Sequence, residues 1–451
     1  LGIWISKEYI SPGIEAEAII EPDTQPEIRK RMSLGEKRLT QITTPAKEKA
    51  IKAYREGNYG AAITEFEASL KQKLNDPESL VYLNNAKAEI ADRNPIKIAI
   101  SIPLGTAPPI AMEMLRGTAQ IQNEVNNDGG ITGGYLQVVI MDDDNNPEIG
   151  KQIAQAVVQD PDTIAVVGSN TTEVSRVTSE IYQSGGVVMV NPTSWGDGIT
   201  GADKDYIFRA VSSPDLMAQK LAQDVSDTFG ESKIAICYDD SAQDNMSFKN
   251  VFIKEFLKLG GSILDKENGF DCQFNAPFFN ANSLVEEAKE SGAEGLLLAP
   301  HINKLEPALS IARENDGELS LFSSTSLYTG KVLEEGQDTV NGLTFYAPWH
   351  PDIDPDNKFY VEGKELWKGR FNWRTATTLE ATLAVVEGLK QASEPTRNQL
   401  KQVMRQPNNF EVDGISPTPI SFSNGDREGE PVKVQVQPGG NLGYDFVLQK
   451  E

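Results

Sequence analysis

Hydrophobic positions between residues 96 and 190 follow two periods in turn. Short runs rich in β-branched residues, typical of buried strands, alternate with stretches of ten or more residues whose apolar positions recur at helical spacing. This alternation predicts right-handed βαβ units and a parallel sheet. The predicted strands are 96–102, 136–141, 164–168 and 187–190, and the predicted helices are 110–126, 148–159 and 173–184.

Polar residues gather where these strands end. Ligands of parallel α/β sheets bind outside the carboxyl ends of the strands. The segments in that position are 101–108, 142–146, 169–173 and 191–196. We therefore expect a ligand site among these four loops.

The same alternation returns after Pro214 and predicts a second α/β block. Its helices are 216–229, 246–259, 282–291 and 304–315, and its strands are 233–239, 261–267, 295–299 and 319–323. A strand at 340–346 follows, then helices at 375–391 and 396–405, and finally strands at 432–436 and 444–448. In this last part of the chain the helices fit one lobe and the strands fit the other. This order indicates that the chain passes between two lobes more than once.

The region before residue 95 has a different character. Residues 6–45 combine four prolines with many charges and predict an extended linker. From about residue 46 to residue 90 the period is helical. Tyr59, Ala62, Phe66 and Leu70 fall on one helical face and, with their neighbours, resemble the tetratricopeptide (TPR) helix-turn-helix pattern.

The TPR-like match spans fewer repeats than the roughly three that a stable solenoid needs, so this unit must pack on something else. Two interpretations remain open for it. It is a docking module for a partner protein, or it is a helical spacer between a membrane and the main domain. The second interpretation is slightly favoured.

Composition and charge limit the function. The chain has 451 residues and a formal net charge of −24 at pH 7, which repels nucleic-acid phosphates and argues against such a partner. Two histidines and two cysteines are too few to predict a metal site, and no cofactor is expected. Cys237 and Cys272 form a disulfide in an oxidising compartment or remain two buried thiols, and the second interpretation is favoured.

The first residues suggest processing. The apolar run Leu1-Gly2-Ile3-Trp4-Ile5 meets a polar stretch at Ser6, with tryptophan at the boundary. We expect the remnant of a removed membrane anchor or signal segment, the alternative being a stray apolar terminus.

Several segments between residues 95 and 450 match one family in order and spacing. The chain resembles the type I periplasmic solute-binding proteins of ABC transporters, in particular the Leu/Ile/Val-binding group. With its anchor-like start and TPR-like region it resembles a cyanobacterial-type, membrane-tethered form. The matching segments are 96–100, 126–131, 142–147, 165–169, 185–192, 206–209, 233–236 and 373–389.

The resemblance implies an α/β fold of two Rossmann-like lobes joined by three crossings, with a ligand held in the cleft by hinge closure. The crossings are expected near Ser212-Ser213, Ala347-Pro348 and Ile415–Pro419. The implied divisions are a linker (1–45), a TPR-like segment (46–94), lobe 1 (95–212 plus 347–414) and lobe 2 (213–346 plus 415–451).

The resemblance also assigns binding residues in lobe 1. In the family the loop at 168–174 binds the ligand's α-carboxylate, and Thr172, flanked by Thr171 and Glu173, matches the serine that does so. In the next loop Thr193 would offer its backbone and Ser194 its hydroxyl, while Trp195 replaces a threonine. Without the resemblance these threonines would be read as helix caps.

In lobe 2, Gln243 and His301 match tyrosines that line the cleft. Ser326 stands where branched-chain amino-acid binders have the glutamate that neutralises the ligand ammonium. Because a buried ammonium needs a counter-charge, either another acid substitutes or the ligand is an amide, a polar carboxylate, a nucleobase-like compound or a small peptide. The candidate acids are Asp239, Asp240, Asp244 and Glu173.

The expected function is non-enzymatic. The sequence has no Gly-x-Ser-x-Gly elbow, P-loop or His-Glu-x-x-His motif. We expect an extracytoplasmic solute-binding protein that delivers a small polar ligand, an amino acid or related compound, to an ABC permease. The alternative is a membrane-tethered receptor domain that signals to a partner protein.

Overall fold

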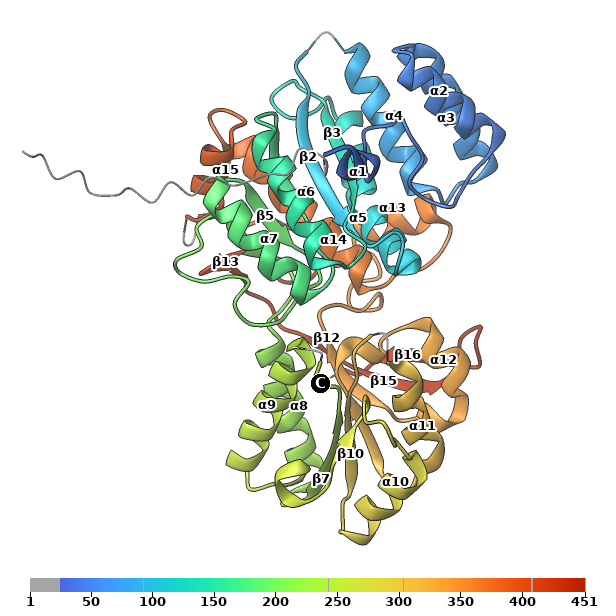
Figure 1. The fold of residues 1–451 in the computed structure, drawn as a ribbon, viewed down its shortest axis with the longest axis vertical. Helices are drawn as coiled ribbons and strands as arrows, with labels where there is room; N and C mark the ends of the chain where they lie inside the picture. The colour runs from blue at the N-terminus through green and yellow to red at the C-terminus, as the bar shows by residue number, and fades with distance from the viewer. Residues whose placement is uncertain (1–24, 92, 242, 303, 407–408, 451) are drawn as a thin grey trace, which may run out of the picture.

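The computed structural model describes residues 25–450 except 92, 242, 303 and 407–408. It consists of two α/β lobes, one above the other along the long axis, with a small helical unit on the outer side of the first (Figure 1). The expected anchor remnant at residues 1–5 lies outside the described residues.

The first lobe is built on an eight-stranded mixed sheet. Its central strands are parallel and are almost completely buried, which explains their continuous apolar character. The strand at Ile96–Ile102 begins and ends where the sequence predicts it. In spatial order the strands are β1 (Met32–Ser33), β3 (Leu136–Asp142), β2 (Ile96–Ile102), β4 (Thr163–Val167), β5 (Val188–Asn191), β6 (Ile207–Arg209), β14 (Asp426–Arg427) and β13 (Phe422–Ser423).

The second lobe holds another mixed sheet of eight strands, in which the strand Val432–Pro438 pairs antiparallel with both of its neighbours. The strands at Gly295–Ala299 and Tyr444–Leu448 again match their predicted ranges. The spatial order is β16 (Tyr444–Leu448), β15 (Val432–Pro438), β12 (Thr344–Ala347), β11 (Ser320–Ser323), β10 (Gly295–Ala299), β7 (Lys233–Tyr238) and β8 (Ser262–Leu264), with β9 (Cys272–Gln273) paired to β7.

Helices cover both sheets. Many begin with proline in the first turn or with a side-chain cap, as in α6, where Asn146 Oδ1 accepts from the backbone N–H groups of Glu148 and Ile149. The first lobe carries α5 (Pro108–Asn127), α6 (Pro147–Gln159), α7 (Thr172–Gly185), α13 (Lys358–Trp367), α14 (Trp373–Gln391) and α15 (Arg397–Met404). The second carries α8 (Pro214–Phe229), α9 (Gln243–Lys258), α10 (Ala281–Glu290), α11 (Leu305–Asn315) and α12 (Gly330–Gly336), with 3₁₀ turns at Lys266–Asn268, Thr325–Leu327 and Gln337–Val340.

The last crossing between the lobes lies later than the sequence indicated. β14 pairs with β6 of the first sheet, and β15 already belongs to the second sheet. The chain therefore crosses at residues 428–431, not near Ile415–Pro419. A buried ion pair between Arg427 and Glu380 of α14 holds this segment on the first lobe.

The prediction that residues 1–45 form an extended linker is wrong for the described part of this region. Gln25–Lys30 is a helix, α1, and Met32–Ser33 pairs antiparallel with Met141 and Ile140 as edge strand β1. The Arg31 guanidinium reinforces the pairing by donating to the Asp142 carboxylate at 2.9 Å. Two residues of strand are too few to show a period, so no pattern in the sequence indicates this strand.

The predicted helical region forms three helices, α2 (Pro45–Arg55), α3 (Tyr59–Gln72) and α4 (Pro77–Ile90). Ala62 and Phe66 are fully buried, and Tyr59 and Leu70 pack at the edge of the same core, as the predicted face requires. α4 rests on α5 and β3 of the first lobe, and α2 and α3 lie outside it (Figure 1).

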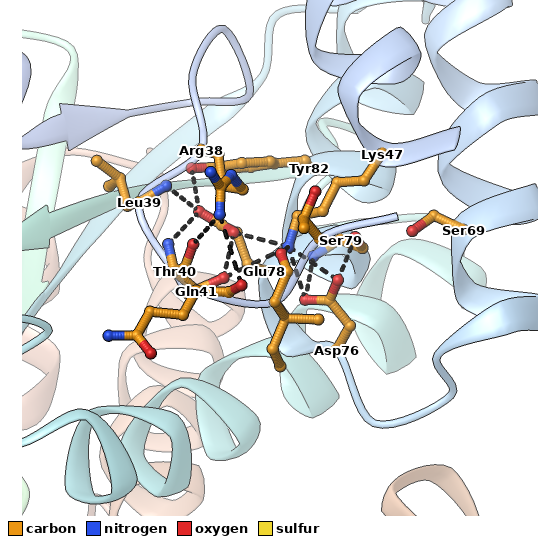
Figure 2. A network of polar contacts seen from close by, with 12 residues as sticks. Arg38, Leu39, Thr40, Gln41, Lys47, Ser69, Asp76, Glu78, Ser79 and Tyr82 are labelled. Carbon is orange, nitrogen blue, oxygen red and sulfur yellow. Dashed lines mark hydrogen bonds and ion pairs between the residues drawn. The ribbon is translucent and has the colours of Figure 1, made fainter. Parts of the chain in front are cut away.

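A buried charge cluster joins these helices to the loop before them. The Lys47 ammonium, on α2, lies 2.8 Å from the Asp76 carboxylate and 2.7 Å from that of Glu78, and all three side chains are fully buried (Figure 2). Glu78 also accepts from the backbone N–H groups of Leu39 and Thr40. The cluster therefore ties the loop at 38–42 to α2 and α4.

Cys237 and Cys272 form a disulfide, so the favoured interpretation of two separate thiols is wrong. β9 pairs with β7 in a register that places the two cysteines opposite each other. The sequence could not show this, because β9 is only two residues long.

Replacing both cysteines by serine is expected to lower the free energy of unfolding by about 2–4 kcal/mol, because the bond closes a loop of 35 residues in the unfolded chain. Urea unfolding of the variant and the parent measures this. Reductant should lower the free energy of unfolding of the parent by a similar amount and leave that of the variant unchanged. A parent insensitive to reductant under unfolding conditions would contradict the prediction.

Candidate functional site

A small, partly open cavity lies between the lobes at the ends of the sheet strands. Its volume is about 40 Å³, room for about three water molecules. The lobes also touch directly, because the Ser247 hydroxyl of α9 donates to the Asp197 carboxylate of the first lobe at 2.9 Å. The lining residues are Ile110, Asn170, Thr171, Glu173, Thr193, Trp195, Trp373 and Arg374 from the first lobe, and Asp244, His301, Ile302, Thr325 and Ser326 from the second.

Two loops of the first lobe hold each other in place at this cavity. The hydroxyls of Thr193 and Ser194 donate to the Asn170 carbonyl at 3.1 and 3.0 Å. The Asn191 side chain accepts from the backbone N–H groups of both residues. These bonds fix the 168–173 and 191–196 segments as one rigid wall, as expected for a preorganised binding site.

Six of the nine residues that the sequence singled out surround the cavity: Thr171, Glu173, Thr193, Trp195, His301 and Ser326. Two lie behind the wall. The Thr172 hydroxyl accepts from the Gly196 N–H at 3.2 Å, and the Ser194 hydroxyl is bonded to Ser175 as well as Asn170. Gln243 begins α9, but its side chain lies outside the described residues.

The second lobe brings an acid to the cavity next to the position where the family glutamate is missing. Ser326 is held by the Asn245 amide, which donates to its hydroxyl at 3.1 Å, and Asp244 precedes that asparagine. Burial raises the pKa of Asp244, and the nearby Glu173 carboxylate raises it further, whereas His301 lowers it. Of the four acids proposed as substitutes, Asp244 and Glu173 line the cavity.

The sequence did not identify Arg374 and Trp373, which begin α14. Arg374 is 7% exposed and its guanidinium lies 4.4 Å from the centre of the Trp373 ring. Burial lowers the pKa of Arg374 to about 10, so the side chain stays charged at neutral pH. The available signal was an arginine in the first turn of a helix that is buried over nearly its whole length.

Four of the lining side chains have buried polar atoms without a hydrogen-bond partner among the described residues. They are Thr171 Oγ1, Thr325 Oγ1, Trp373 Nε1 and Arg374 Nε. Because unpaired buried polar groups cost free energy, such a cluster indicates a site that a polar ligand completes. Over the same described ranges, no group of three acidic, histidine or cysteine side chains is placed to hold a metal ion.

The comparison with protein families decides the class. The periplasmic binding protein family model matches residues 95–433. The chain belongs to this family. It is of the type I, Leu/Ile/Val-binding group, and is therefore a substrate-binding protein of the ABC-transporter type and not an enzyme.

Two similar proteins differ widely from this chain in sequence. The chain is 22% identical to the leucine-, isoleucine-, valine-, threonine- and alanine-binding protein of Pseudomonas aeruginosa over 357 residues, 78% of this chain and 86% of that protein. It is 23% identical to the Leu/Ile/Val-binding protein of Escherichia coli over 324 residues, 70% and 84% of the two chains.

Solved structures of the family share the fold. A leucine-binding protein from Thermotoga maritima superposes with a TM-score of 0.68 at 20% identity, covering 78% of this chain and 97% of that one. The closed form of the leucine-, isoleucine-, valine-, threonine- and alanine-binding protein of Brucella ovis gives 0.67 at 14% identity, with 79% and 95% covered. No helix in the described ranges has the length and apolar character needed to cross a membrane.

Proposed function

We propose that this family member binds a small polar ligand, an amino acid or a related amide or carboxylate, between its lobes and presents it to an ABC permease. The observation that carries the proposal is the cluster of unpaired polar atoms around the interlobe cavity. The amino acids named for the similar proteins from P. aeruginosa and E. coli support this ligand class.

Closure of the lobes is the proposed binding motion. The cavity takes residues from both lobes. The three connecting segments lie together, because Ser212, Pro348 and Gly429 line a common hollow. A ligand that contacts both lobes shifts the population toward the closed form.

The disulfide supports an extracytoplasmic location, because such bonds persist in oxidising compartments. The helices α2 and α3 lie outside the first lobe and leave a surface for a protein partner, which is the proposed role of the TPR-like segment. Tethering to a membrane and a signalling role stay predictions from the sequence.

A thermal-shift screen tests the ligand class. Ligand-free protein, prepared by unfolding, dialysis and refolding, is heated with single amino acids, amides and small carboxylates. A ligand at 100 times its Kd adds about 2.7 kcal/mol of stability, which raises Tm by a few degrees. Nucleosides serve as controls and are expected to have no effect. If no amino acid, amide or carboxylate raises Tm, the proposal is wrong.

A further inference from the structure

We infer that Arg374, with Trp373, binds the carboxylate of a short zwitterionic ligand whose ammonium lies at Glu173 and Asp244. This rests on the proposed function and adds to it the charge, orientation and size of the ligand. It also assigns the ligand carboxylate to the start of α14, whereas the family resemblance assigns it to the loop at 168–174.

The first argument is the state of the Arg374 side chain. It is buried at the cavity wall, yet its guanidinium forms no hydrogen bond or ion pair with a described residue. The nearby acid, Glu113, uses its carboxylate to bind Arg116 and Thr375. A buried, unpaired guanidinium is costly, and its planar donors match a carboxylate.

The second argument is the adjacent donor. Trp373 Nε1 is buried without a partner and borders the same cavity. Both residues stand in the first turn of α14, a helix of 19 residues, whose dipole also favours a negative group there. The unpaired donors of Trp373 and Arg374, at the start of one helix and bordering the cavity, together form an anion site.

The third argument is the distribution of negative charge. Glu173 and Asp244 approach the cavity from different lobes and act electrostatically on each other, together with His301. The basic side chain that acts on Asp244 is that of His301. Separate positive and negative groups around one cavity match a ligand that carries both charges.

The fourth argument is size. A cavity of about 40 Å³ accepts only a handful of non-hydrogen atoms. Glycine and alanine match this volume, whereas the isobutyl group of leucine requires the lobes to part. The lining contains nine polar or charged residues and four apolar ones, which are Ile110, Ile302, Trp195 and Trp373.

Calorimetric titration of the ligand-free protein with glycine, alanine, glycinamide and leucine tests the inference. We expect glycine or alanine to bind more tightly than leucine. Glycinamide, which keeps the ammonium but has no carboxylate, should bind at least about 30-fold more weakly than glycine. This comparison uses the parent protein alone and does not depend on the folding of a variant.

Arg374→Gln supplies the second readout. It should weaken glycine binding by about 30-fold or more and remove the preference for glycine over glycinamide. Arg313→Gln, which breaks an exposed ion pair with Glu306 on the second lobe, is the matched control and should change neither affinity.

Two results would overturn the inference and leave the proposed function standing. One is a preference for carboxylate over amide that persists in Arg374→Gln. The other is leucine binding more tightly than glycine and alanine. If none of the four compounds binds and the wider screen of amino acids, amides and carboxylates also gives no stabilisation, the proposed function itself falls.

Discussion

Replacing Lys47 by methionine is expected to lower the free energy of unfolding of the helical unit α2–α4 by about 3–5 kcal/mol. The ammonium lies 2.8 and 2.7 Å from two carboxylates, those of Asp76 and Glu78, in a fully buried cluster. Methionine fills similar space but leaves both acids without a counter-charge. The loop at 38–42 also loses a bond, since Lys47 donates to the Ile42 carbonyl at 3.0 Å.

Hydrogen exchange of residues 38–90 is the appropriate measurement, because this unit can open locally while both lobes stay folded. The control is Lys49→Met, on the exposed face of the same helix, which should change stability by less than about 0.5 kcal/mol. Equal exchange rates in the Lys47 and Lys49 variants would show that the cluster contributes nothing to the stability of the unit.

Arg427→Met is expected to lower the free energy of unfolding of the first lobe by a similar amount, about 3–5 kcal/mol. The guanidinium is 4% exposed and binds the Glu380 carboxylate, which is 1% exposed, through Nε and Nη2 at 3.1 Å each. It also donates to the Thr418 carbonyl at 3.1 Å. The substitution leaves a buried acid unpaired and frees the segment that precedes the last crossing.

Urea unfolding measures the stability change, and glycine or alanine titration shows whether the cleft survives. Arg313→Met is the control, since its partner Glu306 is exposed and such pairs contribute at most about 1 kcal/mol. If the double variant with Glu380→Gln is no more stable than Arg427→Met alone, the unpaired acid is not the cause of the loss.

The fold could be predicted where hydrophobic period and length were both strong. The buried strands at Ile96–Ile102 and Gly295–Ala299 and the helix Pro108–Asn127, predicted at 110–126, show this. The strands that were missed, such as Met32–Ser33 and Asp426–Arg427, have two residues each. These segments are strands only because they pair with strands that are distant in the sequence. No local pattern of residues predicts that pairing.

The candidate site was predictable in part for a related reason. Loops at strand ends must meet at one edge of a sheet, so Thr193 and His301 could be placed near a common cavity from the sequence. Thr172, to which the resemblance assigned the ligand carboxylate, lies behind the cavity wall, and its neighbour Thr171 lines the cavity instead. Arg374 depends on how α14 returns to the first lobe after the second crossing. That geometry cannot be read from neighbouring residues, and the arginine itself resembles an ordinary first-turn residue.

The short strand at Met32–Ser33 has a consequence beyond the first lobe itself. It pairs with Ile140 and Met141 at the outer side of β3, and strand edges without such a partner are templates for intermolecular strand addition. The residues that provide this cover precede the family-matched segment, 95–433. In this chain, part of the exposed edge of the first sheet is therefore shielded from other chains by residues outside the segment that the family model matches.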